Sequence, residues 1–134
     1  MYGLIGKQLE HSFSADFFNR KFKNEGIKEN YRLFPLHSID ELPLLIEKNP
    51  QLRGLNVTIP YKQSVLLYLD EISREAKEIG AVNVIKIERE NNKFKLVGFN
   101  SDYIGFRDSL LPLLNAKIKK SLILGTGGAS LAVK

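Results

Sequence analysis

The sequence has 134 residues, of which 43% are hydrophobic and 26% charged, so one domain of ordinary size can bury a core and keep a polar surface. It contains no cysteine, which excludes disulfides and thiolate metal sites, and its two histidines, His11 and His37, are too isolated to predict a metal site. The net charge of +5 comes from lysines and arginines along the whole chain, without the aromatic–basic alternation of a base-stacking surface. We therefore expect no nucleic-acid partner, whereas an anionic small substrate is compatible with this charge.

The N-terminal stretch MYGLIGKQLEHS lacks the charged segment and long apolar run of a secretory signal. The longest apolar runs, such as VLLYL, are too short to cross a bilayer. These features predict a cytoplasmic protein with no membrane partner. They leave open whether it is a monomer or a homodimer.

Strand and helix patterns alternate along the chain. Short apolar runs that end in turn residues predict strands, and apolar residues at helical spacing between serine and glycine or proline signals predict helices. The expected strands cover residues 2–6, 31–36, 52–60, 81–89, 93–99 and 120–125, and the expected helices cover 14–26, 38–50, 73–80 and 101–114. This order predicts an α/β fold with a mixed, mostly parallel sheet flanked by helices, in which a polar turn near residues 88–94 forms a hairpin.

Two serines stand where the first expected strand gives way to a helix, in the stretch HSFS. Ser12 or Ser14 can cap the helix, because a serine hydroxyl accepts a hydrogen bond from one of the free N–H groups there. The same N–H groups and the positive end of the helix dipole favour an anion, which neighbouring hydroxyls can help to hold. The pattern leaves both roles open, and one serine can cap while the other binds a carboxylate.

The stretch NVTIPYK places Asn56 and Thr58 on one side of a strand, because they alternate with apolar residues. Pro60 ends the strand, and Lys62 follows at once. Ligands of α/β folds usually lie at the carboxyl ends of parallel strands, and an amide, a hydroxyl and an ammonium group together suit a polyol. An ordinary edge strand with a solvated lysine fits the pattern equally well.

Two further polar residues, Asn83 in GAVN and Asp102 in NSD, stand at the borders of expected elements. A buried Asn83 amide needs hydrogen-bond partners, which backbone groups alone could supply. Asp102 is in the position of a helix N-cap, the role that its place in the sequence favours. If Asp102 faces Lys62, the pair can move a proton: charged lysine donates to a carbonyl under reduction, and neutral lysine accepts from an alcohol under oxidation.

The last stretch, SLILGTGGASLAVK, has an apolar run, a glycine cluster and small residues that could open a helix. This order is typical of a nucleotide-binding turn. Ser130 occupies the place of the third glycine in a complete G-x-G-x-x-G, so a simple strand–helix turn is the alternative.

Taken together, the stretches HSFS, NVTIPYK, GAVN, NSD and GTGGAS resemble the shikimate dehydrogenase family, whose order and spacing they follow over almost the whole chain. The resemblance implies a shikimate- and dehydroshikimate-binding domain over residues 1–116. It implies that residues 117–134 are the truncated start, first strand and glycine loop, of an NADP-binding Rossmann domain. The implied reaction is reversible NADPH-dependent reduction of 3-dehydroshikimate to shikimate, in the biosynthesis of chorismate and aromatic amino acids.

The resemblance also implies a role for each matching residue. Lys62 would be the catalytic acid–base residue, paired with Asp102. The implied substrate-binding residues are Ser12, Ser14, Asn56, Thr58, Lys62, Asn83 and Asp102, and the implied cofactor-binding residues are Gly125, Gly127, Gly128, Ala129 and Ser130. The chain departs from the family pattern at Ala15 and Phe18, where proline and histidine are frequent, and at Ser101, where threonine is usual.

A Rossmann βαβ unit takes about 30 residues or more, and only four follow Ser130. We therefore expect the chain to be a piece of a longer enzyme, inactive by itself. Two alternatives stay open: a quinate/shikimate dehydrogenase that uses NAD, and a stand-alone ligand-binding domain without catalysis.

Overall fold

A six-stranded mixed sheet forms the centre of the computed structural model, which describes residues 1–91, 93–114 and 120–134. The strand order across the sheet is β2-β1-β3-β5-β6-β4. The strands are β1 (Tyr2–Gly6), β2 (Tyr31–Pro35), β3 (Gly54–Val57), β4 (Glu71–Ile72), β5 (Val84–Glu90) and β6 (Lys93–Phe99). β1 is parallel to β2 and β3, β5 is antiparallel to β3 and β6, and β4 is parallel to β6.

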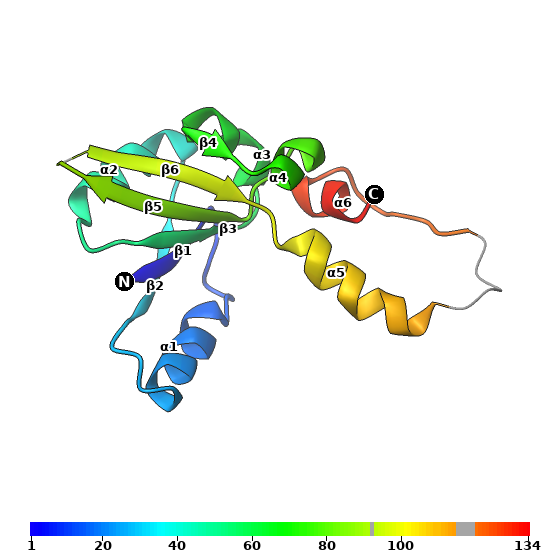
Figure 1. Ribbon diagram of the computed structural model, residues 1–134, viewed down its shortest axis with the longest axis horizontal. Coiled ribbons are helices and arrows are strands. Elements are labelled where there is room, and N and C mark those ends of the chain that lie inside the picture. The colour runs from blue at the N-terminus through cyan, green and yellow to red at the C-terminus, as the bar shows by residue number, and fades with distance from the viewer. Residues whose placement is uncertain (92, 115–119) are drawn as a thin grey trace.

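Helices cover both faces of this sheet (Figure 1). One face carries α1 (Ser14–Asn24), and the other carries α2 (Leu42–Lys48), α3 (Tyr61–Ser64) and α4 (Arg74–Ile79). Short 3-10 turns, η1 (Ile39–Glu41), η2 (Val65–Tyr68) and η3 (Leu111–Leu113), extend α2, α3 and the helix α5 (Asp102–Leu110). α5 leaves the end of β6 and runs away from the sheet, and α6 (Gly128–Val133) packs against α5.

The two faces of the sheet have cores of different size, because strand side chains alternate between faces. Leu4 of β1 faces α1 in the smaller core, and the next residue, Ile5, faces the larger core on the side of α2. Leu55 and Val57 of β3 also enter the larger core. The same alternation leaves Asn56 on the α1 side, where a cavity forms beside the sheet.

The local signals for most elements are confirmed. Ser73 accepts a hydrogen bond from the Ala76 N–H at the start of α4, and Gly80 ends that helix in the left-handed region at φ 72°. The expected helix over residues 38–50 divides into η1 and α2, with a capping box between Ser38 and Glu41 at its start. The short strand β4 has no signal in the sequence pattern, since it is only two residues long.

The expectation of a strand over residues 120–125 is wrong. These residues form no strand, and the side chains of Leu122 and Leu124 are largely exposed. A strand needs a neighbour to take up its backbone N–H and C=O groups, and the described part of the chain places none beside this segment. The expected first strand of a Rossmann domain is therefore not formed. The expected domain boundary at residues 116 and 117 lies outside the described residues.

The packing of α2 against the sheet predicts the effect of shortening one leucine. Leu42 is fully buried in the larger core, whereas Leu67 in η2 is 89% exposed. Leu42→Ala should lower the free energy of unfolding by about 2–5 kcal/mol through lost burial and a residual cavity. The matched change Leu67→Ala should stay within about 0.5 kcal/mol of the unaltered chain. Urea unfolding of the two variants measures both values, and an equal effect would contradict this account of the core.

Candidate functional site

Most of the residues singled out in the sequence analysis lie at one edge of the sheet. β1 and β3 are parallel, so the residues that follow both strands leave at the same edge. β5 is antiparallel to β3, which brings the residues before β5 to that edge, and β6 returns to it because it is antiparallel to β5. The segments that hold Thr58, Asn83 and Asp102 therefore converge there, at the carboxyl ends of the parallel strands.

Lys62 and Asp102 are in direct contact although 40 positions separate them in the sequence. The Lys62 Nζ donates to Asp102 Oδ2 at 2.7 Å, with the two side chains 15% and 32% exposed. Asn83 Nδ2 donates to the other carboxylate oxygen, Oδ1, at 2.7 Å. Both oxygens of Asp102 are therefore held by side chains, one from α3 and one from the segment before β5, which fixes the direction in which Lys62 presents its ammonium group.

Asp102 is the first residue of α5, and its carboxylate caps no backbone N–H group. The N-cap role favoured by its position in the sequence is therefore wrong, because Lys62 and Asn83 take both oxygens. Asn100 stabilises the turn before α5: its Oδ1 accepts from the Asp102 N–H at 2.9 Å, and its Nδ2 donates to the carbonyl of Ala81 at 2.9 Å. Sequence reasoning gave Asn100 no role, and the only signal was its place beside Asp102 at the end of an apolar strand.

The two serines take different positions at the start of α1. The Ser14 N–H donates to Ser12 Oγ at 3.3 Å, so Ser12 supplies the cap-like contact. Both serines are partly exposed. Ser14 Oγ makes no hydrogen bond within residues 1–91, 93–114 and 120–134, which leaves this hydroxyl available to a ligand.

Thr58 lies close to the end of β1. Its N–H donates to the carbonyl of Ile5 at 2.9 Å, and a Cβ added to Gly6 would lie 2.5 Å from Thr58 Cγ2. Gly6 therefore gives Thr58 the space to pack beside the loop that leads to the serines. Asn56 and Thr58 face the same side of the sheet, as their alternation with the buried Leu55 and Val57 predicts.

The glycine segment lies against the stem of Lys62, although residues 120–125 before it form no strand. A Cβ added to Gly128 would lie 2.7 Å from Lys62 Cβ and 3.3 Å from Ala81 Cβ. Gly125 has φ 122°, a conformation that favours glycine, and open space surrounds both Gly125 and Gly127. Ser130 Oγ donates to the carbonyl of Gly127 at 2.7 Å, inside the first turn of α6. The start of α6 therefore lies against the stem of Lys62.

The cluster combines an ammonium group, a carboxylate, two amides and nearby hydroxyls, which can bind a hydroxylated ligand and transfer a proton.

No three His, Asp or Glu side chains gather as metal ligands anywhere in the described ranges. Within the same ranges, no helix has the length and apolar character that crossing a membrane requires.

The fold and this cluster define an α/β domain with a polar site at the carboxyl edge of a mixed sheet. A sequence profile of the shikimate dehydrogenase substrate binding domain matches residues 4–85. The shikimate dehydrogenase (NADP(+)) of Clostridium beijerinckii is 46% identical over 136 aligned positions, which cover 98% of this chain and 48% of the relative. The chain belongs to the shikimate dehydrogenase family.

Solved structures agree with this assignment. Shikimate dehydrogenase from Aquifex aeolicus has a TM-score of 0.83 and 41% identity, covering 98% of this chain and 49% of that one. The Thermus thermophilus enzyme, solved in complex with shikimate, has a TM-score of 0.81 and 31% identity over the same shares. A further shikimate dehydrogenase in complex with NADP+ has a TM-score of 0.80 and 40% identity, covering 98% of this chain and 45% of that one. This chain thus spans about half the length of these relatives.

The contact between α6 and Lys62 can be tested with two neighbouring glycines. Gly128→Ala places a methyl group in the space of Lys62 Cβ, so α6 should move off the lysine and the Lys62 side-chain NMR signals should shift. Gly127→Ala meets nothing within 4 Å and has an ordinary φ of −79°, so it should leave those signals in place. Unchanged Lys62 signals in Gly128→Ala would contradict the packing of α6 on this residue.

Proposed function

We propose that this chain is the substrate-binding part of an NADP-dependent shikimate dehydrogenase, which reversibly reduces 3-dehydroshikimate to shikimate in the route to chorismate and aromatic amino acids. The observation that carries the proposal is the Lys62–Asp102 ion pair, held by Asn83 at the carboxyl edge of the sheet. The complex of the Thermus thermophilus relative with shikimate supports the choice of substrate.

Lys62 is the residue that moves the proton in this proposal. As an ammonium group it donates a proton to the carbonyl oxygen during reduction, and as a neutral amine it takes that proton back from the hydroxyl during oxidation. Asp102 orients the amine and balances its charge through the 2.7 Å contact. Asn83 holds the carboxylate in place and so acts on the proton transfer through Asp102.

The remaining polar residues bind and orient the substrate. Ser12 and Ser14, beside the N–H groups that open α1, suit the carboxylate of the ring. Asn56 and Thr58 offer an amide and a hydroxyl to the ring oxygens from the end of β3. Asn83, Lys62 and Asp102 complete the set of substrate-binding residues.

The glycine segment is the part of this chain that would approach the cofactor pyrophosphate, through Gly125, Gly127, Gly128, Ala129 and Ser130. The open space at Gly125 and Gly127 fits the close approach of a phosphate to the backbone. NADP, when bound, supplies the hydride. The relative solved with NADP+ supports this cofactor.

Calorimetric titration of shikimate into the 134-residue chain tests substrate binding directly. We expect saturable binding that is weakened about tenfold by Thr58→Ala, since one ligand hydrogen bond is lost. Lys77→Ala, an exposed change on α4, should leave the affinity unaltered. A parallel titration of quinate separates the shikimate-specific enzyme from the quinate-using alternative. No shikimate binding by the folded chain would contradict the proposed substrate.

Turnover tests the role of Lys62 when this chain is joined to a complete cofactor domain. Lys62→Ala should lower kcat by about 10²–10⁴-fold with a smaller change in KM, because proton transfer is lost while most binding contacts stay. Lys77→Ala again serves as the control. An unchanged kcat would remove Lys62 from proton transfer. Rates with NADPH and with NADH distinguish the proposed cofactor from the NAD alternative.

A further inference from the structure

Tyr31, at the start of β2, reaches across β1 to the side chain of Asn56 in β3. Its hydroxyl donates to Asn56 Oδ1 at 2.7 Å. Tyr31 is 3% exposed, and its burial raises the pKa of the phenol above its ordinary value. The hydroxyl therefore stays protonated over the whole physiological pH range and remains a hydrogen-bond donor. The sequence pattern gives no sign of this contact, since the two residues are 25 positions apart.

The position of Tyr31 is fixed by α1. Asn19 of α1 accepts from the Tyr31 N–H at 2.8 Å and donates to the Tyr31 carbonyl at 3.0 Å. The Phe18 ring stacks on the Tyr31 ring, with 4.7 Å between centroids and an interplanar angle of 17°. The backbone and the ring of Tyr31 are thus both held in place. Its hydroxyl therefore has little freedom to turn toward a partner other than Asn56.

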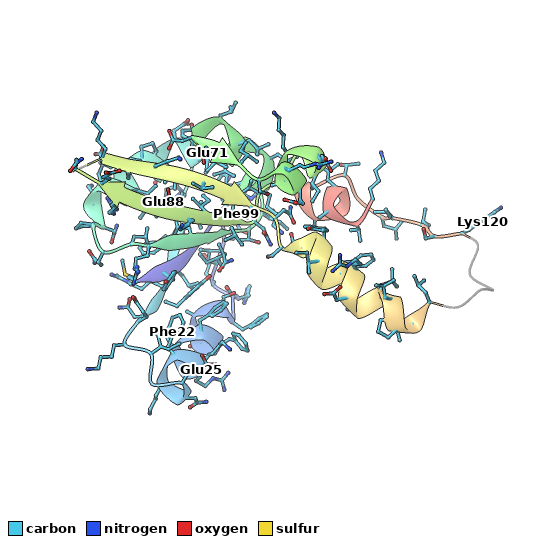
Figure 2. All side chains as sticks on the ribbon, viewed as in Figure 1. Phe22, Glu25, Glu71, Glu88, Phe99 and Lys120 are labelled. Carbon is cyan, nitrogen blue, oxygen red and sulfur yellow. The ribbon has the colours of Figure 1, made fainter. Side chains whose placement is uncertain are left out.

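Asn56 faces a cavity of about 700 Å³ between α1 and the sheet, which is also lined by Phe22 and Phe99, labelled in Figure 2. Its carbonyl oxygen is engaged by Tyr31, and its Nδ2 donates to no side chain or backbone group of the described ranges. With one lone pair of its oxygen taken by Tyr31, the amide has its NH2 group, with two N–H donors, left to offer to a ligand.

We propose that Tyr31 is a positioning residue that orients the Asn56 amide so that it presents a hydrogen-bond donor, and not an acceptor, to the oxygens of the substrate. The inference rests on the proposed function for the identity of the ligand. An N–H donor suits the hydroxyl of shikimate and the carbonyl of 3-dehydroshikimate equally well, because both oxygens accept hydrogen bonds. An amide oxygen in the same place would repel a carbonyl oxygen. The fixed orientation therefore lets one side chain serve a ring in both oxidation states.

The contact can be tested without a ligand by NMR on the 134-residue chain. Tyr31→Phe keeps the ring and removes the hydroxyl, so the Asn56 carbonyl carbon should shift upfield as its hydrogen bond is lost. Asn56→Ala identifies the signal. Tyr68→Phe is the matched control, because it removes a tyrosine hydroxyl that bonds to Asp40 outside this site. An Asn56 carbonyl signal that does not move in Tyr31→Phe would overturn the proposed orientation.

A double-mutant cycle in shikimate binding tests the effect on the ligand. Tyr31→Phe should weaken binding about fivefold to tenfold, as expected for a lost orienting hydrogen bond. In the Asn56→Ala background the same change should weaken binding less than about twofold, because there is no amide to orient. A purely structural role for the hydroxyl predicts the same loss in both backgrounds, and that result would contradict the inference.

The two experiments separate this inference from the proposed function. If the unaltered chain is folded but binds no shikimate, the proposed substrate fails, and the role of Tyr31 in binding it fails as well. The carbonyl signal of Asn56 still decides in that case whether Tyr31 orients the amide. If shikimate binds and the cycle is additive, the proposed function stands and the positioning role of Tyr31 is wrong.

Discussion

The polar groups of Asn83 join three segments that meet at the site. Its backbone carbonyl accepts from Val57 at the end of β3, and its backbone N–H donates to Phe99 at the end of β6. Its side-chain oxygen accepts from the Ser101 N–H, and its side-chain nitrogen donates to Asp102. A buried amide in an apolar run must satisfy all these groups, which leaves few arrangements of the surrounding chain. The Lys62–Asp102 pair depends on this constraint.

The two faces of the sheet have different roles. The larger core packs α2, α3 and α4 against one face and fixes the strands in register. The face toward α1 is less completely filled and carries the cavity beside Asn56 and Tyr31. Alternate residues of β3 point to opposite faces. This one strand therefore supplies Leu55 and Val57 to the larger core and the Asn56 amide to the cavity. Stability and the binding groups therefore arise from the same short strand.

Agreement between sequence pattern and structure depends on whether the signal is local. Ser73 and Gly80 mark the ends of α4 because capping and left-handed glycine act within one turn. The apolar run before Gly125 carries an equally clear strand signal, yet it forms no strand, because a ladder needs a partner that a local pattern cannot supply. Asp102 shows the same limit in a side chain, since its position favours a cap while its partners are Lys62 of α3 and Asn83, the residue before β5.

The sequence by itself determined the α/β class, most of the elements, and the family, because hydrophobic spacing, capping residues and ordered motifs are properties of short stretches. It also identified Lys62, Asn83 and Asp102 as candidates. Only the tertiary structure decided that these three touch, that Gly128 lies against Lys62, and that Tyr31 holds the Asn56 oxygen. Those contacts depend on the order and direction of strands in the sheet, which bring together residues that local pattern cannot relate.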